Sequence, residues 1–68
     1  MENSEAYRQV RLNSINVLTV FIEEAWMNCF DVTAFDEEDG VWITNFADTY
    51  LLAVELADKI ILEVVKEY

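Results

Sequence analysis

The sequence predicts a small single-domain α+β fold in which two antiparallel helices pack against a two-stranded hairpin, in the order αββα. Three observations predict it: apolar residues at helical spacing near the front, a β-branched and aromatic stretch around an acidic turn, and an uninterrupted helical pattern at the end. With 68 residues, the chain has room for one domain, which we place at residues 1–68.

The first predicted helix covers residues 7–26. Its apolar positions share one face that is about 160° wide when successive residues turn by about 100°. These positions are Tyr7, Val10, Ile15, Leu18, Phe21, Ile22, Ala25 and Trp26. Asn3 or Ser4 is expected to cap the start of this helix, and Asn28 is expected to end it in the left-handed conformation.

The middle of the chain, residues 30–46, is predicted to form the hairpin. Residues 30–35 and 41–46 are rich in β-branched and aromatic side chains, and an acidic segment separates them. Asp39 and Gly40 place the only glycine of the chain where a turn needs a positive φ.

A helical alternative exists for the same segment. Thr33 and Asp36 have the spacing of a capping box, and Phe35, Trp42 and Phe46 would line one stripe of a short helix. That alternative changes the fold class to an all-α three-helix bundle.

The last third of the chain predicts a second helix. Asn45 and Asp48 form a second capping pair, and neither Gly nor Pro interrupts the pattern before about residue 67. Apolar residues sweep an arc of roughly 240° on this helix, which is wider than one core face can cover. They are Leu51, Ala53, Val54, Leu56, Ala57, Ile60, Ile61, Leu62, Val64 and Val65.

The apolar excess predicts self-association. The segment 41–46 also carries apolar side chains on both sides of its predicted strand, and 54% of the chain is hydrophobic. A domain of this size is marginally stable unless something reinforces it, and the single Cys29 rules out an intrachain disulfide. We therefore expect a homodimer.

The charge is negative and central. The formal net charge is -10, and residues 12–58 carry ten acidic side chains with no Lys or Arg. Such a field repels nucleic acid and anionic membranes and attracts basic protein surfaces. We therefore expect a basic protein partner, with no direct binding to nucleic acid or membrane.

Neither a metal site nor a catalytic site is predicted. Aligning Gly40 with the glycine of a calcium loop puts Phe35 first and Phe46 last, where carboxylates are required. The nucleophile candidates Ser4, Ser14 and Cys29 have no histidine to activate them, because the chain contains none. We expect no metal, no cofactor and no enzymatic activity.

The start of the chain has neither the positive region nor the apolar region of a secretory signal, so we expect a cytoplasmic protein. The longest apolar stretch near the front, residues 17–22, is far shorter than a membrane span.

These features favour a non-enzymatic module that docks on a basic protein surface, most obviously that of a nucleic-acid-binding protein, and blocks it. In size and charge the chain is similar to the small acidic inhibitors that phages encode against host nucleases and repair enzymes, anti-CRISPR proteins among them. The predicted partner-binding residues are Glu23, Glu24, Asp31, Asp36, Glu37, Glu38, Asp39, Asp48 and Trp42. The alternative is a structural or regulatory dimerisation subunit, antitoxin-like or immunity-like, that binds through apolar contacts.

Overall fold

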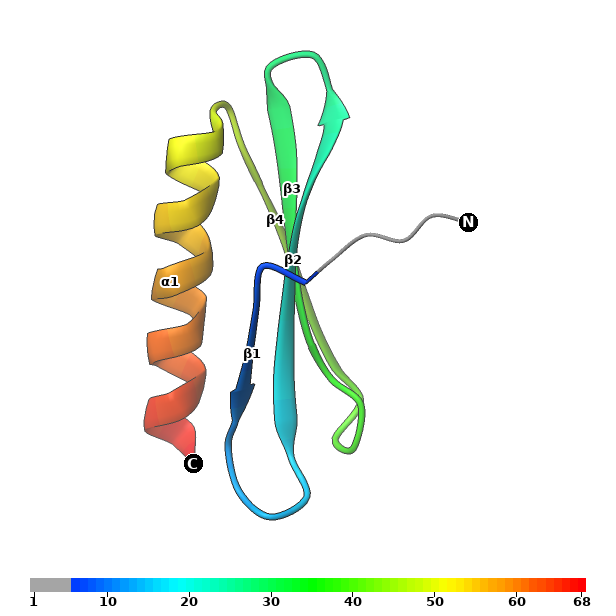
Figure 1. Ribbon diagram of the computed structural model, residues 1–68, viewed down its shortest axis with the longest axis vertical. Helices are drawn as coiled ribbons and strands as arrows, with labels where there is room; N and C mark the ends of the chain where they lie inside the picture. The colour runs from blue at the N-terminus through cyan, green and yellow to red at the C-terminus, as the bar shows by residue number, and fades with distance from the viewer. Residues whose placement is uncertain (1–5) are drawn as a thin grey trace.

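The computed structural model describes residues 6–68 and contains one four-stranded sheet and one helix. The strands are β1 (Arg8–Arg11), β2 (Val17–Trp26), β3 (Cys29–Asp36) and β4 (Val41–Ala47), and the helix is α1 (Tyr50–Glu67). Each strand pairs antiparallel with the next in chain order, and α1 lies along one face of the sheet (Figure 1). The protein is therefore a two-layer α+β fold with one helical layer.

The predicted first helix is wrong, and with it both the αββα order and the three-helix alternative. Residues 7–26 contain β1, a turn and β2 instead. The run from Val17 to Ile22 is rich in β-branched residues, which prefer the extended backbone. The side-chain oxygen of Asn13 accepts hydrogen bonds from the backbone N–H groups of Ile15 (2.9 Å) and Asn16 (2.8 Å) and so closes the turn.

The predicted ends of that helix have different outcomes. The caps expected at Asn3 or Ser4 lie outside the described residues. Asn28 does adopt the left-handed conformation, with φ of 58°, but it does so in the turn that joins β2 to β3. Its short polar side chain makes this conformation accessible in a turn as well as at a helix end.

The predicted hairpin in residues 30–46 is confirmed. β3 and β4 pair without a register shift from Phe30 opposite Ala47 to Asp36 opposite Val41. Gly40 takes the positive φ that the turn needs, at 66°.

The helix predicted for the last third of the chain is present, but it starts later than expected. Asn45 lies within β4, and Thr49 is the residue that caps α1. The hydroxyl of Thr49 accepts a hydrogen bond of 3.1 Å from the backbone N–H of Leu52. This bond satisfies one of the donors that the first turn of a helix leaves unpaired.

Replacing Thr49 with alanine is expected to lower the free energy of unfolding by about 1 kcal/mol, because the capping acceptor is lost. Urea unfolding followed by circular dichroism measures this change. Thr49→Ser keeps the hydroxyl and serves as the control. Equal stability of the alanine and serine variants would show that the cap contributes nothing.

The core lies between α1 and the facing side of the sheet. The small side chains of Ala53 and Ala57 let the helix backbone approach the strands closely, and Ile60 and Ile61 fill the space beside them. The buried apolar residues are Leu18, Val20, Val32, Ala34, Ala53, Ala57, Ile60 and Ile61. Burial is therefore concentrated on one face of the sheet.

Two further contacts tie Tyr7 and the start of β1 to the helix. The hydroxyl of Tyr7 donates a hydrogen bond of 3.0 Å to Asp58, and the guanidinium of Arg8 lies 3.9 Å from the same carboxylate oxygen. Burial, together with this hydrogen bond, raises the pKa of Tyr7. Arg8 and Asp58 are about half exposed, so their ion pair adds little stability.

Across residues 6–68, α1 is the single helix, and its length and hydropathy do not fit a membrane span.

Candidate functional site

The candidate site is the face of the sheet that points away from α1, which we call the open face. Successive side chains on a strand point to opposite sides, so the neighbours of the core residues Leu18, Val20, Val32 and Ala34 belong to this face. Figure 1 shows the helix on one side of the sheet only. The strand residues of the open face are Gln9, Arg11, Val17, Thr19, Phe21, Glu23, Asp31, Thr33, Phe35, Trp42, Thr44 and Phe46.

An aromatic row crosses the open face from β2 to β4. Phe35 is stacked between Phe21 and Trp42, with ring centroids 6.0 Å and 4.7 Å away and interplanar angles of 8° and 13°. Trp42 stands directly opposite Phe35 in the strand register, whereas Phe21 is its diagonal neighbour. The row ends at Trp42, whose surface is 66% exposed.

Carboxylates lie on both sides of this row. On the side towards the β2–β3 turn, Glu23 and Asp31 stand opposite each other on adjacent strands. On the other side, Glu37 and Glu38 line a groove of about 610 Å³ together with Phe21 and Phe35. The row is thus bracketed by acidic groups from three segments of the chain.

The groove also contains a basic residue. Arg11 lines it from β1, on the side away from Trp42. The four bracketing carboxylates outnumber this one guanidinium, so the surface around the aromatic row keeps a negative field.

The predicted partner-binding set is divided between several places. Glu23, Asp31 and Trp42 share the open face, and Glu37 and Glu38 border its groove. The other four members, Glu24, Asp36, Asp39 and Asp48, lie elsewhere.

Three of those four are exposed at the surface away from the open face. Glu24 lies on the same side of β2 as the core residue Val20. Asp48 lies in a hollow beside α1, next to Leu52. Asp39 accepts a hydrogen bond from the hydroxyl of Tyr68, and this bond, with burial, raises the pKa of Tyr68.

Asp36 is a structural residue, because its surface is only 2% exposed. One carboxylate oxygen accepts hydrogen bonds from the side chains of Asn16 (2.9 Å) and Tyr68 (3.1 Å). The other accepts from the backbone N–H groups of Glu38 (3.0 Å) and Asp39 (3.4 Å).

This arrangement controls the ionisation of Asp36. Burial raises the pKa of Asp36, but the four hydrogen bonds lower it by more, so that it lies below its ordinary value. The carboxylate is therefore charged at neutral pH, and both of its oxygens are engaged in hydrogen bonds within the fold.

Phe21, Phe35 and the threonines of the open face were not among the predicted site residues. The sequence contains a signal for them, since Val17, Thr19, Phe21 and Glu23 alternate with the core residues of the same strand. That alternation becomes readable only when the segment is treated as a strand.

The described residues offer no cluster of three potential metal ligands. Cys29, at the start of β3, is a half-buried free thiol.

Comparisons of the chain with protein-family models, with curated proteins and with solved structures found no match. The function is therefore argued from the site itself.

Proposed function

We propose that this protein is a non-enzymatic binding module that docks its open face on a basic surface of another protein and blocks it. The observation that carries the proposal is the stacked row of Phe21, Phe35 and Trp42, uncovered by the helix and bracketed by carboxylates.

An uncovered aromatic row indicates a contact surface. In a two-layer fold, the solvent side of an antiparallel sheet usually carries polar residues. Here, Trp42 and Phe46 are 66% and 65% exposed on that side. Large apolar side chains gathered on one exposed face are typical of binding sites.

The chemistry of the row fits arginine and lysine side chains. A guanidinium stacks on the face of an aromatic ring, and tryptophan gives the strongest such interaction. A carboxylate beside the ring then accepts charge-assisted hydrogen bonds from the same group. Trp42 and Phe35 supply the rings, and Glu23 lines a hollow together with both of them. Glu37 borders the groove that Phe35 lines, and Asp31 stands opposite Phe46.

The net charge adds attraction at longer range. A charge of -10 on a small domain steers basic surfaces towards it and speeds their association. Basic proteins that bind nucleic acid present the strongest complementary field, so we propose that they are the targets. A rigid module seated on such a surface would exclude the nucleic acid.

Single-stranded nucleic acid is the competing ligand for a four-stranded sheet with exposed aromatic rings, because bases stack on such rings. Binding of that kind also needs basic side chains along the phosphate backbone. Among the described residues of the open face, Arg11 is the one basic side chain, and four carboxylates surround it, which favours a cationic ligand over a nucleic acid.

The test uses Trp42 as its reporter, in a Trp26→Phe background that leaves one tryptophan. An oligo-arginine peptide is expected to quench the fluorescence of Trp42 and to bind more weakly as salt rises from about 50 mM to about 500 mM. A single-stranded oligonucleotide serves as the comparison ligand and is expected not to bind. Binding of the oligonucleotide without binding of the peptide would overturn the proposal.

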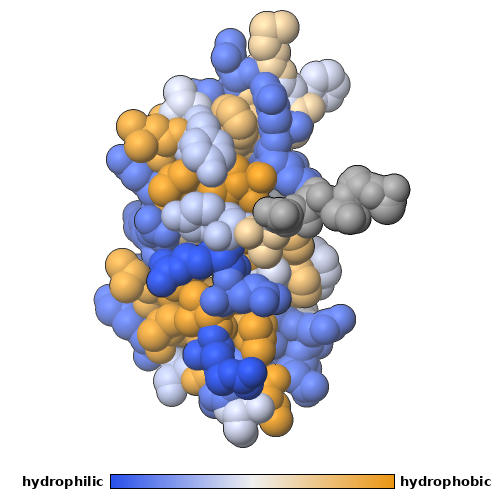
Figure 2. Space-filling view, viewed as in Figure 1, coloured by the Kyte–Doolittle hydropathy of each residue, from blue (hydrophilic) through white to orange (hydrophobic). Residues whose placement is uncertain are grey.

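The outer side of α1 favours a second candidate, a structural or regulatory subunit held by apolar contacts. Leu51 and Leu62 are 68% and 66% exposed there, and apolar patches reach the surface along the helix in Figure 2. A partner bound in this way would resist salt, so the same salt titration separates the two candidates.

A further inference from the structure

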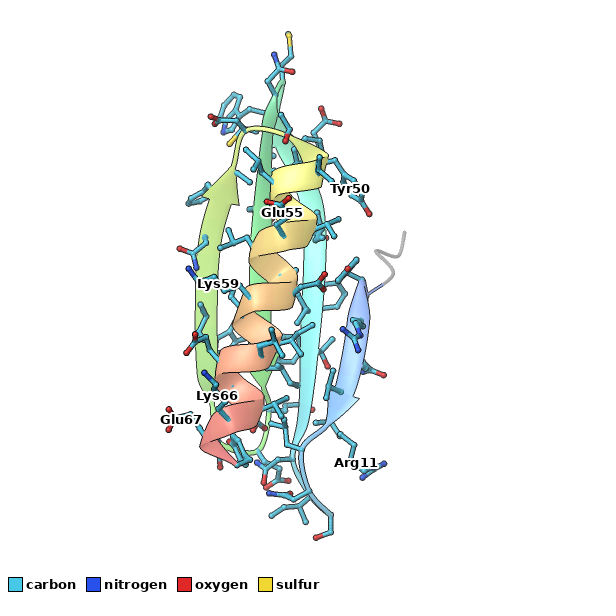
Figure 3. The ribbon with its side chains drawn as sticks, turned by 90° about the vertical axis from the view of Figure 1, so that its left-hand side faces the viewer. Arg11, Tyr50, Glu55, Lys59, Lys66 and Glu67 are labelled. Atoms are coloured by element: carbon cyan, nitrogen blue, oxygen red, sulfur yellow. The ribbon has the colours of Figure 1, made fainter. Side chains whose placement is uncertain are left out.

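The outer edge of β4 is open in the part of the chain that the structure describes. The sheet order places β4 at the end of the sheet, and among residues 6–68 its one strand partner is β3. Figure 3 shows it along one side of the molecule, with α1 in front of the sheet and no further strand beyond it. Its outer backbone groups can therefore pair with another strand.

The sequence of β4 does nothing to discourage such pairing. Natural edge strands are usually protected by charges, proline, bulges or short length. β4 is seven residues long, has no charged residue and no proline, and pairs with β3 without a register shift. The opposite edge strand, β1, has four residues, of which Arg8 and Arg11 are charged.

We propose that two copies of this chain pair antiparallel through β4, about a two-fold axis at Thr44, to form one continuous eight-stranded sheet. The occupant is a second copy because the strand is complementary to itself. Trp42 and Phe46 stand two residues before and two residues after Thr44, on the same face. The axis therefore sets Trp42 of each copy directly opposite Phe46 of the other.

This register sets the exposed rings of the two copies side by side on the open face. Aromatic pairs that face each other across strands stabilise a sheet, and Trp42 and Phe46 are both about two-thirds exposed in the single chain. All seven residues of β4 find a partner in this register, whereas a shift along the strand leaves some unpaired. The row of Phe21, Phe35 and Trp42 then continues into Phe46 of the second copy.

The side of α1 that flanks β4 is also suitable for a contact. Two hollows lie there, lined in part by Ile43, Leu52 and Leu56. Lys59 lines both hollows and offsets part of the charge of the nearby glutamates. The two helices would lie on the same side of the joined sheet, so these apolar flanks would face each other.

The test is a disulfide at the axis, in a Cys29→Ser background. In the proposed register Thr44 faces Thr44 of the second copy, with Cα atoms about 5 Å apart, a separation that a disulfide spans. Thr44→Cys is therefore expected to form a cross-linked dimer under mild oxidation. Thr44 and Asn45 are both exposed, so neither substitution removes a core contact.

Asn45→Cys is the matched control. The same register separates the two copies of residue 45 by about 8 Å, beyond the roughly 7 Å limit for a disulfide. The expected result is cross-linking of Thr44→Cys alone. The unmodified protein at micromolar concentration is expected to sediment with twice the mass of a single chain.

Three results would overturn the proposal: a monomer mass at that concentration, equal cross-linking of both variants, or a dimer that neither variant cross-links. A dimer that neither variant cross-links would assign the contact to another surface, such as the outer side of α1. The inference does not depend on the proposed function. Cross-linking needs no basic ligand, and peptide binding needs no dimer, so either can fail alone.

Discussion

Replacing Asp36 with alanine is expected to lower the melting temperature by on the order of 10 °C or more, the largest effect on stability that we expect from a polar residue. The substitution removes all four hydrogen bonds at once. It leaves the amide of Asn16, only 4% exposed, without its acceptor, and a buried donor without a partner is costly. Thermal unfolding followed by circular dichroism measures the change.

Tyr68→Phe is the matched control, because it removes one donor to Asp36 and keeps the ring. It is expected to change the melting temperature much less than Asp36→Ala. If Asp36→Ala melts within a few degrees of the unmodified protein, Asp36 does not hold the turns and the chain end together.

The pH dependence of stability follows from the same residue. The pKa of Asp36 in the folded protein lies below its unfolded value of about 3.9, so its contribution is complete above that pH. It is lost as the pH falls through the lower, folded-state pKa. The loss of stability in acid, below about pH 4, is therefore expected to be smaller in Asp36→Asn than in the unmodified protein.

The parts of the fold that the sequence predicts correctly are those with local signals. Gly40 marks the β3–β4 turn through its positive φ, and residues 50–67 contain neither Gly nor Pro. Both features act within a few residues of chain, so they can be recognised without knowledge of the neighbours.

The helix predicted from Tyr7 to Trp26 is wrong because β2 carries apolar side chains on both of its faces. Phe21 points to the open face, and Val20 and Ile22 point to the core, so strict alternation is absent and a helical stripe fits by coincidence. Asn13 favours a turn in this segment, because its side chain competes with the helical backbone for hydrogen bonds and accepts from the N–H groups of Ile15 and Asn16.

The candidate site is only partly visible in the sequence. The acidic character is evident, but which acids share a face depends on the pairing of strands that are distant in the chain. Asp36 shows this clearly: it sits in an acidic turn, yet Asn16 and Tyr68, which are 20 and 32 residues away, enclose it. Its burial is a property of the tertiary structure.

Neutralising one acid on the open face and one that borders its groove is expected to weaken the binding of the oligo-arginine peptide more than an equal change of charge elsewhere. Asp31→Asn with Glu37→Gln removes one carboxylate on each side of the aromatic row. Each is expected to make a charge-assisted contact, so the pair should weaken binding by about 10- to 50-fold at low salt.

The matched control changes the same number of charges on α1. Glu55→Gln with Glu67→Gln also takes the formal net charge from -10 to -8, but both residues are exposed on the helix. Because the overall field changes equally in the two variants, any difference between them reports on the open face. The control is expected to weaken binding by no more than about threefold.

The most direct measurement is therefore the dissociation constant of the oligo-arginine peptide for these two double variants, side by side, from the fluorescence of Trp42. Selective loss of affinity in the Asp31→Asn, Glu37→Gln variant is the result that the proposed function predicts. Equal affinities in the two variants would contradict it, because the peptide would then respond only to net charge and the open face would not be the docking surface.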